Sequence, residues 1–201
     1  MFLKGKTALI TGSTSGIGLG YARALAAEGA SVMINGFGDA AEIQGYVEEL
    51  IRTSNAGALH SGADMTKPEE IRAMVADCTA KLGAPDILIN NAGILRDASF
   101  PKSSLTDFRT VIDVHLLGSV ICSQAVWPHM KAAGFGRILM TTSTSGIYGN
   151  FGQANYGAAK TGLIGLMNVL QIEGAKNDIR VNALCPSAAT RMTEGLMPES
   201  V

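Results

Sequence analysis

The chain has few of the features that mark nucleic-acid-binding, membrane or secreted proteins. Its 201 residues carry 16 Lys and Arg against 17 Asp and Glu, without a basic cluster, so the electrostatic footprint of a nucleic-acid-binding protein is missing. No apolar run approaches the length of a membrane span. The N-terminus from Met1 to Lys6 is too polar for a signal peptide. We therefore expect neither a nucleic-acid nor a membrane partner.

Cysteine is also scarce. The three cysteines, Cys78, Cys122 and Cys185, are far apart, and no Cys/His spacing is typical of a metal site. They are interpreted as buried thiols in a reducing cytoplasm. No metal ion and a cytoplasmic location are the resulting expectations.

Hydrophobic residues and glycine are abundant. Hydrophobic residues make up 47% of the chain, charged residues 16%, and there are 24 glycines, which suits a single α/β domain over residues 1–201. Short apolar runs predict strands at 7–10, 31–35, 57–60, 86–90, 137–142 and 179–184. The segments between them predict helices at 19–28, 40–53, 66–82, 104–133 (with a bend at Pro128) and 155–176. This alternation predicts a doubly wound parallel sheet with helices on both faces.

A glycine-rich loop joins the first strand to the first helix. Thr11-Gly12-Ser13-Thr14-Ser15-Gly16-Ile17-Gly18 has the strand–loop–helix context of a phosphate-binding loop, where glycines let the backbone approach a pyrophosphate at a helix N-terminus. No Gly-Lys-Ser/Thr ends the loop, so a dinucleotide is favoured over a nucleoside triphosphate. The alternative is a glycine turn selected for tight packing alone. The residues expected at the cofactor here are Gly12, Ser13, Ser15, Gly16, Ile17 and Gly18.

The ends of the second and third strands bear on cofactor choice. Asn35-Gly36-Phe37-Gly38-Asp39 contains no base, and Ser15 stands where a base would favour NADP, so NAD is favoured. Phe37 is expected near the adenosine, whereas Asp39 is interpreted as the N-cap of the next helix. Ala63 and Asp64 follow the third strand; Asp64 would either accept a hydrogen bond from the adenine amine or serve as a loop acid.

Three polar side chains near the fifth strand suggest proton transfer. Tyr156 and Lys160 are one helical turn apart, and Ser143 lies thirteen residues before Tyr156. An ammonium beside a phenol favours the phenolate, so a lowered pKa is expected for Tyr156. Tyr-x-x-x-Lys also occurs by chance on many helices. However, the Gly12 loop, Asp64, Asn90, Ser143 and Pro186 all follow predicted strands, and the carboxyl ends of parallel strands form one ligand-binding rim.

Taken together, these motifs resemble those of the short-chain dehydrogenase/reductase family over essentially the whole chain. The resemblance rests on Thr11-Gly12-x-x-x-Gly16-Ile17-Gly18, Asn90-Asn91-Ala92-Gly93, Ser143 and Tyr156-x-x-x-Lys160. It implies a Rossmann-like sheet of order 3-2-1-4-5-6, a nicotinamide cofactor, hydride transfer at nicotinamide C4 and a homo-oligomer, either dimer or tetramer. It also implies that Tyr156 is the acid/base, that Lys160 holds the nicotinamide ribose and that Ser143 binds the substrate oxygen. Asn90, Ala92, Gly93, Pro186 and Ala189 would contact the cofactor.

One catalytic position departs from the family pattern. The family places an Asn in the long helix before Ser143, where it supports a water of the proton relay, whereas this chain has His115. His115 would take that role through its carbonyl or its ring; the competing interpretation is a buried structural histidine.

The resemblance also bears on the substrate. Residues before Gly93 look like NAD-dependent D-3-hydroxybutyrate dehydrogenases, and those after it look like the (3R)-hydroxyacyl-CoA dehydrogenase domain of the multifunctional β-oxidation enzyme. The former hold a small carboxylate with a His after the catalytic Ser and a Lys before the Tyr, where this chain has Ser145 and Gln153. We therefore expect an (R)-3-hydroxyacyl thioester, with D-3-hydroxybutyrate as the alternative.

Family members continue past the position of Val201 into a substrate lid and a seventh strand. The strand 179–184 is therefore expected as an exposed edge. Pro186-Ser187-Ala188-Ala189-Thr190 replaces the usual Pro-Gly turn and is expected to contact the carboxamide through backbone groups. A dinucleotide-binding scaffold without turnover is the second class of function.

Overall fold

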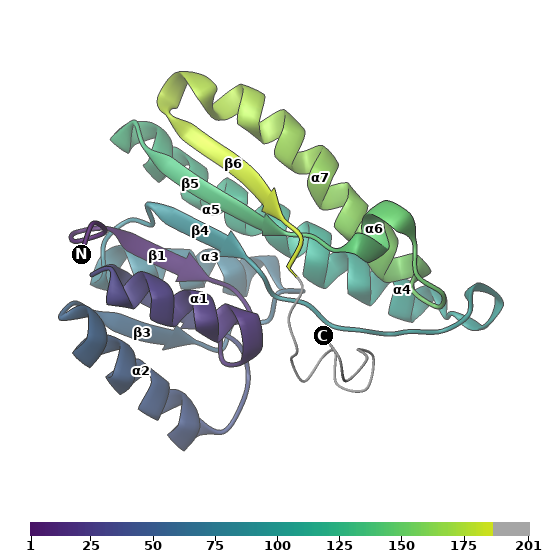
Figure 1. Cartoon of the computed structure of the whole chain (residues 1–201), viewed down its shortest axis with the longest axis horizontal. Helices are drawn as coiled ribbons and strands as arrows, with labels where there is room; N and C mark the ends of the chain where they lie inside the picture. The colour runs from purple at the N-terminus through teal and green to yellow at the C-terminus, as the bar shows by residue number, and fades with distance from the viewer. Residues whose placement is uncertain (187–201) are drawn as a thin grey trace, which may run out of the picture.

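A six-stranded parallel sheet of order β3-β2-β1-β4-β5-β6 forms the centre of the computed structural model, which describes residues 1–186 (Figure 1). This is the predicted order. The strands are β1 Thr7–Ile10, β2 Ser31–Asn35, β3 Ala58–Ser61, β4 Ile87–Asn90, β5 Gly136–Thr141 and β6 Ile179–Leu184. All of their carboxyl ends lie on one rim because every pairing is parallel.

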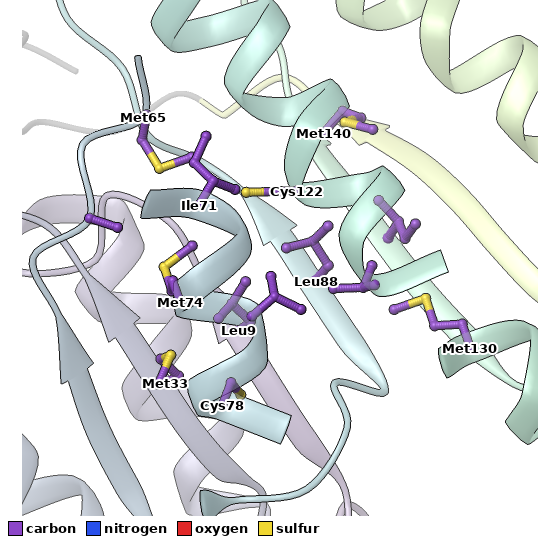
Figure 2. Close-up of a cluster of buried hydrophobic side chains, with 14 of the residues drawn as sticks. Leu9, Met33, Met65, Ile71, Met74, Cys78, Leu88, Cys122, Met130 and Met140 are labelled. Carbon is purple, nitrogen blue, oxygen red and sulfur yellow. The ribbon is translucent and has the colours of Figure 1, made fainter. Parts of the chain in front are cut away.

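Helices cover both faces of this sheet, as predicted. On one face, α1 (Gly16–Ala27) and α2 (Ala40–Ser54) pack Ala22, Ala26, Ile43, Val47 and Leu50 onto β1 and β2. On the other face lie α3 (Pro68–Lys81), α5 (Gly118–Ala133) and α7 (Ala154–Gly174). Figure 2 shows that this second core is rich in sulfur, and its labelled residues include Met33, Met65, Met74, Met130 and Met140.

The long helical region before β5 is interrupted where the sequence did not predict it. It consists of α4 (Leu105–Ile112), a π-helical turn η2 (Asp113–Leu117) and α5, which continues through Pro128. The helix therefore changes its winding at Asp113–Leu117 and not at Pro128, where the sequence predicted a bend. Three short segments were also not predicted: η1 Phe100–Lys102, α6 Thr144–Tyr148 and η3 Ala175–Asn177.

By length and composition, the helical stretch Leu105–Ala133 is sufficient to cross a membrane, which the sequence analysis did not anticipate. Within it, Val111, Cys122 and Val126 are fully buried, and Cys122 and Val126 belong to the core on the α3 side of the sheet. Part of this stretch therefore packs in the core, with 39% of its most apolar segment buried.

The sheet edge at β6 is more open than its centre. All four residues of β1 are buried, as expected for a strand covered on both faces, whereas Arg180, Asn182 and Leu184 of β6 are exposed. Within residues 1–186, β6 pairs with β5 alone, so it is the predicted edge. Burial raises the pKa of the Cys78 and Cys122 thiols to about 12, whereas Cys185 beyond β6 is half-buried, so the prediction of three buried thiols is wrong for Cys185.

Candidate active site

The glycine-rich loop is packed tightly between β1 and the segment after β4. A Cβ on Gly12, which has φ +60°, would lie 2.6 Å from the Ala92 Cα, and one on Gly18 would lie within 2.2 Å of the Gly12 carbonyl oxygen. Internal packing therefore accounts for these two glycines, as the alternative interpretation predicted. The helix begins at Gly16, three residues earlier than predicted, so Gly16, Ile17 and Gly18 form its first turn.

This first turn of α1 also fits an anion. Ser15 makes no side-chain capping bond, and the turn contains no acidic residue. By contrast, α2 is capped by Asp39, whose carboxylate accepts from the amides of Ala41 (2.9 Å) and Glu42 (3.0 Å), as predicted. The free amides and positive end of the α1 dipole are thus suited to a pyrophosphate.

A buried amide side chain, Asn35, ties the loop to the ends of β2 and β3. Its Oδ1 accepts from the Gly12 amide at 3.2 Å, and its Nδ2 donates to the carbonyls of Ser61 (3.1 Å) and Ala63 (2.9 Å). Its main chain exchanges hydrogen bonds with Ser13. The sequence analysis did not single out this function of Asn35, because the three segments are brought together only by the fold.

The other predicted adenosine residues have different surroundings. Phe37 is exposed, and its carbonyl accepts from the Thr14 hydroxyl at 2.9 Å. The Asp64 Oδ1 accepts from both the amide (2.8 Å) and the hydroxyl (2.9 Å) of Thr66, so it acts as a loop acid before α3. Ala63 is buried beside it.

Residues 90–92, at the end of β4 and just after it, contact α5 on one side and the glycine-rich loop on the other. The Asn90 Nδ2 lies 3.3 Å from the Ser123 hydroxyl, and its Oδ1 is buried without a partner among residues 1–186. Asn91, which was not among the predicted site residues, donates to the carbonyls of Thr11 (3.1 Å) and Gly12 (2.8 Å). The amide of Ala92 donates to the Thr11 hydroxyl at 3.0 Å.

The predicted catalytic side chains meet at the ends of β5 and α7. Ser143 follows β5, and its hydroxyl caps α6 by accepting from the Ser145 amide at 3.2 Å. Tyr156 and Lys160 lie in the first two turns of α7, and the Lys160 Nζ is 5.5 Å from the Tyr156 ring centroid. The Lys160 ammonium is buried and donates to the Thr141 carbonyl at 2.6 Å. Tyr156 and Lys160 are therefore adjacent, as their spacing predicted, and Ser143 reaches Tyr156 from the end of β5, as expected for a residue on the same rim.

The electrostatics of the site are dominated by burial. Desolvation lowers the pKa of Lys160 to about 8. Desolvation raises the pKa of Tyr156, and the nearby Ser143 hydroxyl opposes this by lowering it. The pKa of Tyr156 is therefore shifted upward in the structure, opposite to the sequence-based expectation, because the burial of the phenol could not be judged from its spacing to Lys160.

His115 lies in the π-turn and is almost completely buried. Its Nε2 is 2.8 Å from the Ile94 carbonyl and 2.9 Å from the Ile94 amide, and its ring meets that of Tyr156 edge to face with centroids 5.2 Å apart. Its carbonyl accepts from the Ser119 hydroxyl at 2.6 Å. A Cβ on Gly93 would lie 2.3 Å from the ring Cε1, so Gly93 makes room for this histidine. These contacts are those of a buried residue packed directly on Tyr156, with its Nδ1 buried and unpartnered among residues 1–186.

A strap formed by residues 94–98 closes one side of the site. The Ala98 amide donates to the Gly152 carbonyl (2.9 Å), and the Asn155 Nδ2 donates to the Arg96 carbonyl (2.9 Å). The Gln153 Nε2 donates to the Asp97 carboxylate at 2.8 Å, while its Oε1 accepts from Asn150. These contacts hold the strap against the start of α7.

A pocket of about 440 Å³ lies beside this strap and the first turn of α7. Its lining residues are Ser99, Phe100, Pro101, Ser145, Gly149, Asn150, Phe151, Gly152, Gln153, Ala154 and Gly157. Phe100 and Phe151 are exposed at 74% and 90%, so they offer apolar surface to a ligand.

One predicted cofactor contact, Pro186, follows the end of β6. The Leu184 carbonyl accepts from the Thr142 amide at 2.7 Å, which places Pro186 close to Ser143 on the rim. Ala189, like Thr190, lies outside the described residues.

Comparison with known proteins agrees with this geometry. The family model for short chain dehydrogenases matches residues 6–200. The chain is 45% identical over 97% of its length to a peroxisomal multifunctional enzyme type 2 of Drosophila melanogaster, covering 33% of that protein. It is 41% identical over 98% of its length to a peroxisomal hydratase-dehydrogenase-epimerase of Saccharomyces cerevisiae, covering 23% of it. A D-beta-hydroxybutyrate dehydrogenase of Rhizobium meliloti is 39% identical over 96% of this chain and 76% of its own.

The chain thus spans about a third or less of the length of these peroxisomal relatives. The match to the family model covers nearly all of it, including the glycine loop and the Tyr156–Lys160 pair. The chain therefore belongs to the short chain dehydrogenase family of oxidoreductases.

Proposed function

We propose that this chain is an NAD-dependent dehydrogenase that interconverts a secondary alcohol and a ketone, with an (R)-3-hydroxyacyl thioester as its substrate. The observation that carries the proposal is the pairing of Tyr156 with the buried Lys160 beside Ser143, on the same rim as the free first turn of α1. Acid/base, oxygen-binding and anion-binding groups are thereby combined in one site.

The proposal gives each side chain one task. The amides of Gly16, Ile17 and Gly18 hold the pyrophosphate, and Lys160 binds the nicotinamide ribose. Ser143 holds the substrate oxygen, and Tyr156 removes the hydroxyl proton. Bound NAD supplies the hydride acceptor and a positive charge. That charge, together with Lys160, acts against the burial that raises the pKa of Tyr156.

Within this proposal His115 is a positioning residue. Its ring packs on Tyr156, and its Nε2 holds Ile94 at the beginning of the strap. The carbonyl, the other group considered for the proton relay, already accepts from the Ser119 hydroxyl. His115 therefore acts through Tyr156 and the strap.

NAD is proposed rather than NADP because no base occurs in residues 11–18 or 35–39. We also propose a single domain over residues 1–201, a cytoplasmic location and a homo-oligomer. Oligomerisation is supported by two exposed apolar side chains on α7, Val169 at 53% and Ile172 at 78%.

The substrate assignment depends on the residues around the pocket. Gln153 is uncharged and is hydrogen-bonded to the Asp97 carboxylate and to Asn150, so it offers no cation to hold a small carboxylate. The resemblance of the residues after Gly93 to a (3R)-hydroxyacyl-CoA dehydrogenase domain supports a hydroxyacyl substrate. D-3-hydroxybutyrate is the second candidate, and it is favoured by the relative of Rhizobium meliloti that carries that name.

The test is NADH formation, followed by absorbance, with 3-hydroxybutyrate and longer (R)-3-hydroxyacyl thioesters and with NAD and NADP in parallel. We expect the thioesters with NAD to be the best pair, and Tyr156→Phe to abolish turnover. Equal turnover by Tyr156→Phe would contradict the assignment of the acid/base. Tight NAD binding in calorimetry, without hydride transfer to any substrate, would instead identify a dinucleotide-binding scaffold.

A further inference from the structure

The wall between the strap and α7 contains a carboxylate at the edge of the substrate pocket. Asp97 is exposed, and its Oδ2 accepts from the Nε2 of Gln153, which itself lines the pocket. The charge of Asp97 is also felt at Tyr156, where it contributes to raising the pKa of the phenol. Asp97 thus lies within electrostatic reach of both the pocket and the acid/base.

Among residues 1–186, no positive charge balances this carboxylate inside the pocket. None of the described lining residues is Lys or Arg. The Arg96 guanidinium is directed to the Leu95 carbonyl (2.9 Å) and toward Asp107 (3.7 Å). Lys102 is exposed on η1 and does not line the pocket, and the Lys160 ammonium is bonded to Thr141. The pocket therefore combines apolar surface from Phe100, Pro101 and Phe151 with a net negative edge.

We propose that Asp97, held by Gln153, is a specificity-determining residue that selects uncharged acyl esters and thioesters over free 3-hydroxy acids. This inference rests on the proposed function and assigns the substrate class to a particular charge. A free carboxylate entering the pocket would be repelled by Asp97 and would meet no Lys or Arg among the described lining residues. A neutral ester of the same shape avoids this repulsion.

The test compares (R)-3-hydroxybutyrate with its methyl ester, a pair that differs mainly in charge. The readout is the acid-to-ester ratio of kcat/KM. In Asp97→Asn this ratio should rise about fivefold, which is modest because an exposed carboxylate is partly screened by water and salt. Glu48→Gln is the matched control: it removes the same charge from the exposed surface of α2 and should leave the ratio unchanged.

A second substitution separates charge from lost contacts. In Gln153→Lys the new ammonium is next to Asp97 and pairs with it, so the ratio should rise by a similar factor of about five. In the double variant Asp97→Asn/Gln153→Lys the cation is unpaired, and the rise should exceed the product of the two single effects, to roughly fiftyfold. For the unmodified protein, raising the salt from 0.05 to 0.5 M should move the ratio toward that of Asp97→Asn, by about twofold.

The possible results separate this inference from the proposed function. Turnover of the ester with a ratio that changes less than twofold in Asp97→Asn overturns the role of Asp97 and leaves the dehydrogenase assignment intact. Failure of every 3-hydroxyacyl substrate overturns the assignment itself. In that case calorimetric binding of the acid and the ester in the presence of NAD measures the same ratio; equal preferences in the unmodified protein and Asp97→Asn then reject the inference as well.

Discussion

Two parts of the rim differ in the contacts that stabilise them: the part around Asn35 and the part around the strap. At Asn35, a buried amide and main-chain groups join three strand ends, and Gly12 and Gly18 are packed against neighbouring backbone. At the strap, polar side chains span two loops whose aromatic residues Phe100 and Phe151 are exposed. The buried contacts at Asn35 fix the backbone geometry of the glycine-rich loop. The exposed side chains at the strap, by contrast, can be replaced without altering the sheet. Substitutions in the two parts should therefore differ in their effects on catalysis and on stability.

The largest effect is expected at the acid/base on the strap side. Tyr156→Phe should lower kcat by about 10³-fold, within the range for loss of a general acid/base, and leave NAD affinity within about twofold. Rapid kinetics and calorimetry provide these two values. A parallel loss of NAD binding would show that the two parts of the rim are not independent.

Asn35→Asp should produce the largest loss of stability on the cofactor side. The new carboxylate would face the carbonyls of Ser61 and Ala63 without a proton to donate, so we expect a loss of about 3 kcal/mol in the free energy of unfolding and weaker NAD binding. Urea unfolding measures the first quantity. Asn182→Asp on the exposed face of β6 is the control and should cost less than about 0.5 kcal/mol.

The buried His115 should make the free energy of unfolding decrease as the solution becomes acidic. Burial and the Lys160 charge lower its pKa to about 3, so between pH 6.5 and 3 the unfolded chain binds a proton that the folded protein does not. The free energy of unfolding should therefore fall by up to about 1.4 kcal/mol per pH unit as the pH decreases through this window. His115→Asn should remove this slope, whereas His129→Asn on α5 should keep it. The same slope in both variants would contradict a neutral, buried His115.

The smallest effect compares two glycines of α1. A Cβ on Gly20 would meet open space, so Gly20→Ala should stabilise the protein by about 1 kcal/mol through helix propensity. Gly18→Ala, two residues earlier, should destabilise it, because its Cβ would collide with the Gly12 carbonyl. Thermal unfolding of the two variants resolves the difference, and a gain in stability for Gly18→Ala would show that the loop can move away.

The elements that are local in sequence were predictable. Alternating apolar runs and helical segments predicted a parallel sheet covered on both faces, and the family resemblance implied its strand order. Asp39 was identified as a cap, and the four-residue spacing placed Lys160 beside Tyr156. Contacts between distant positions were not. Gln153 and Asp97 are 56 residues apart, and nothing in either local sequence indicates that they meet. The direction of the Tyr156 pKa shift failed for the same reason, since burial is a property of the assembled fold.

The π-helical turn at Asp113–Leu117 has a consequence for insertions and deletions in this chain. An α-helical residue advances the winding by about 100°, and a π-turn accommodates one additional residue in a single turn. The extra residue lets Val111 of α4 and Cys122 of α5 both stay buried while the ring of His115 reaches Ile94. Removing one residue here would rotate α4 relative to α5. Either the buried apolar side chains or the ring of His115 would then lose their contacts. The number of residues between α4 and α5 is therefore constrained by the contacts of His115 with Ile94 and Tyr156.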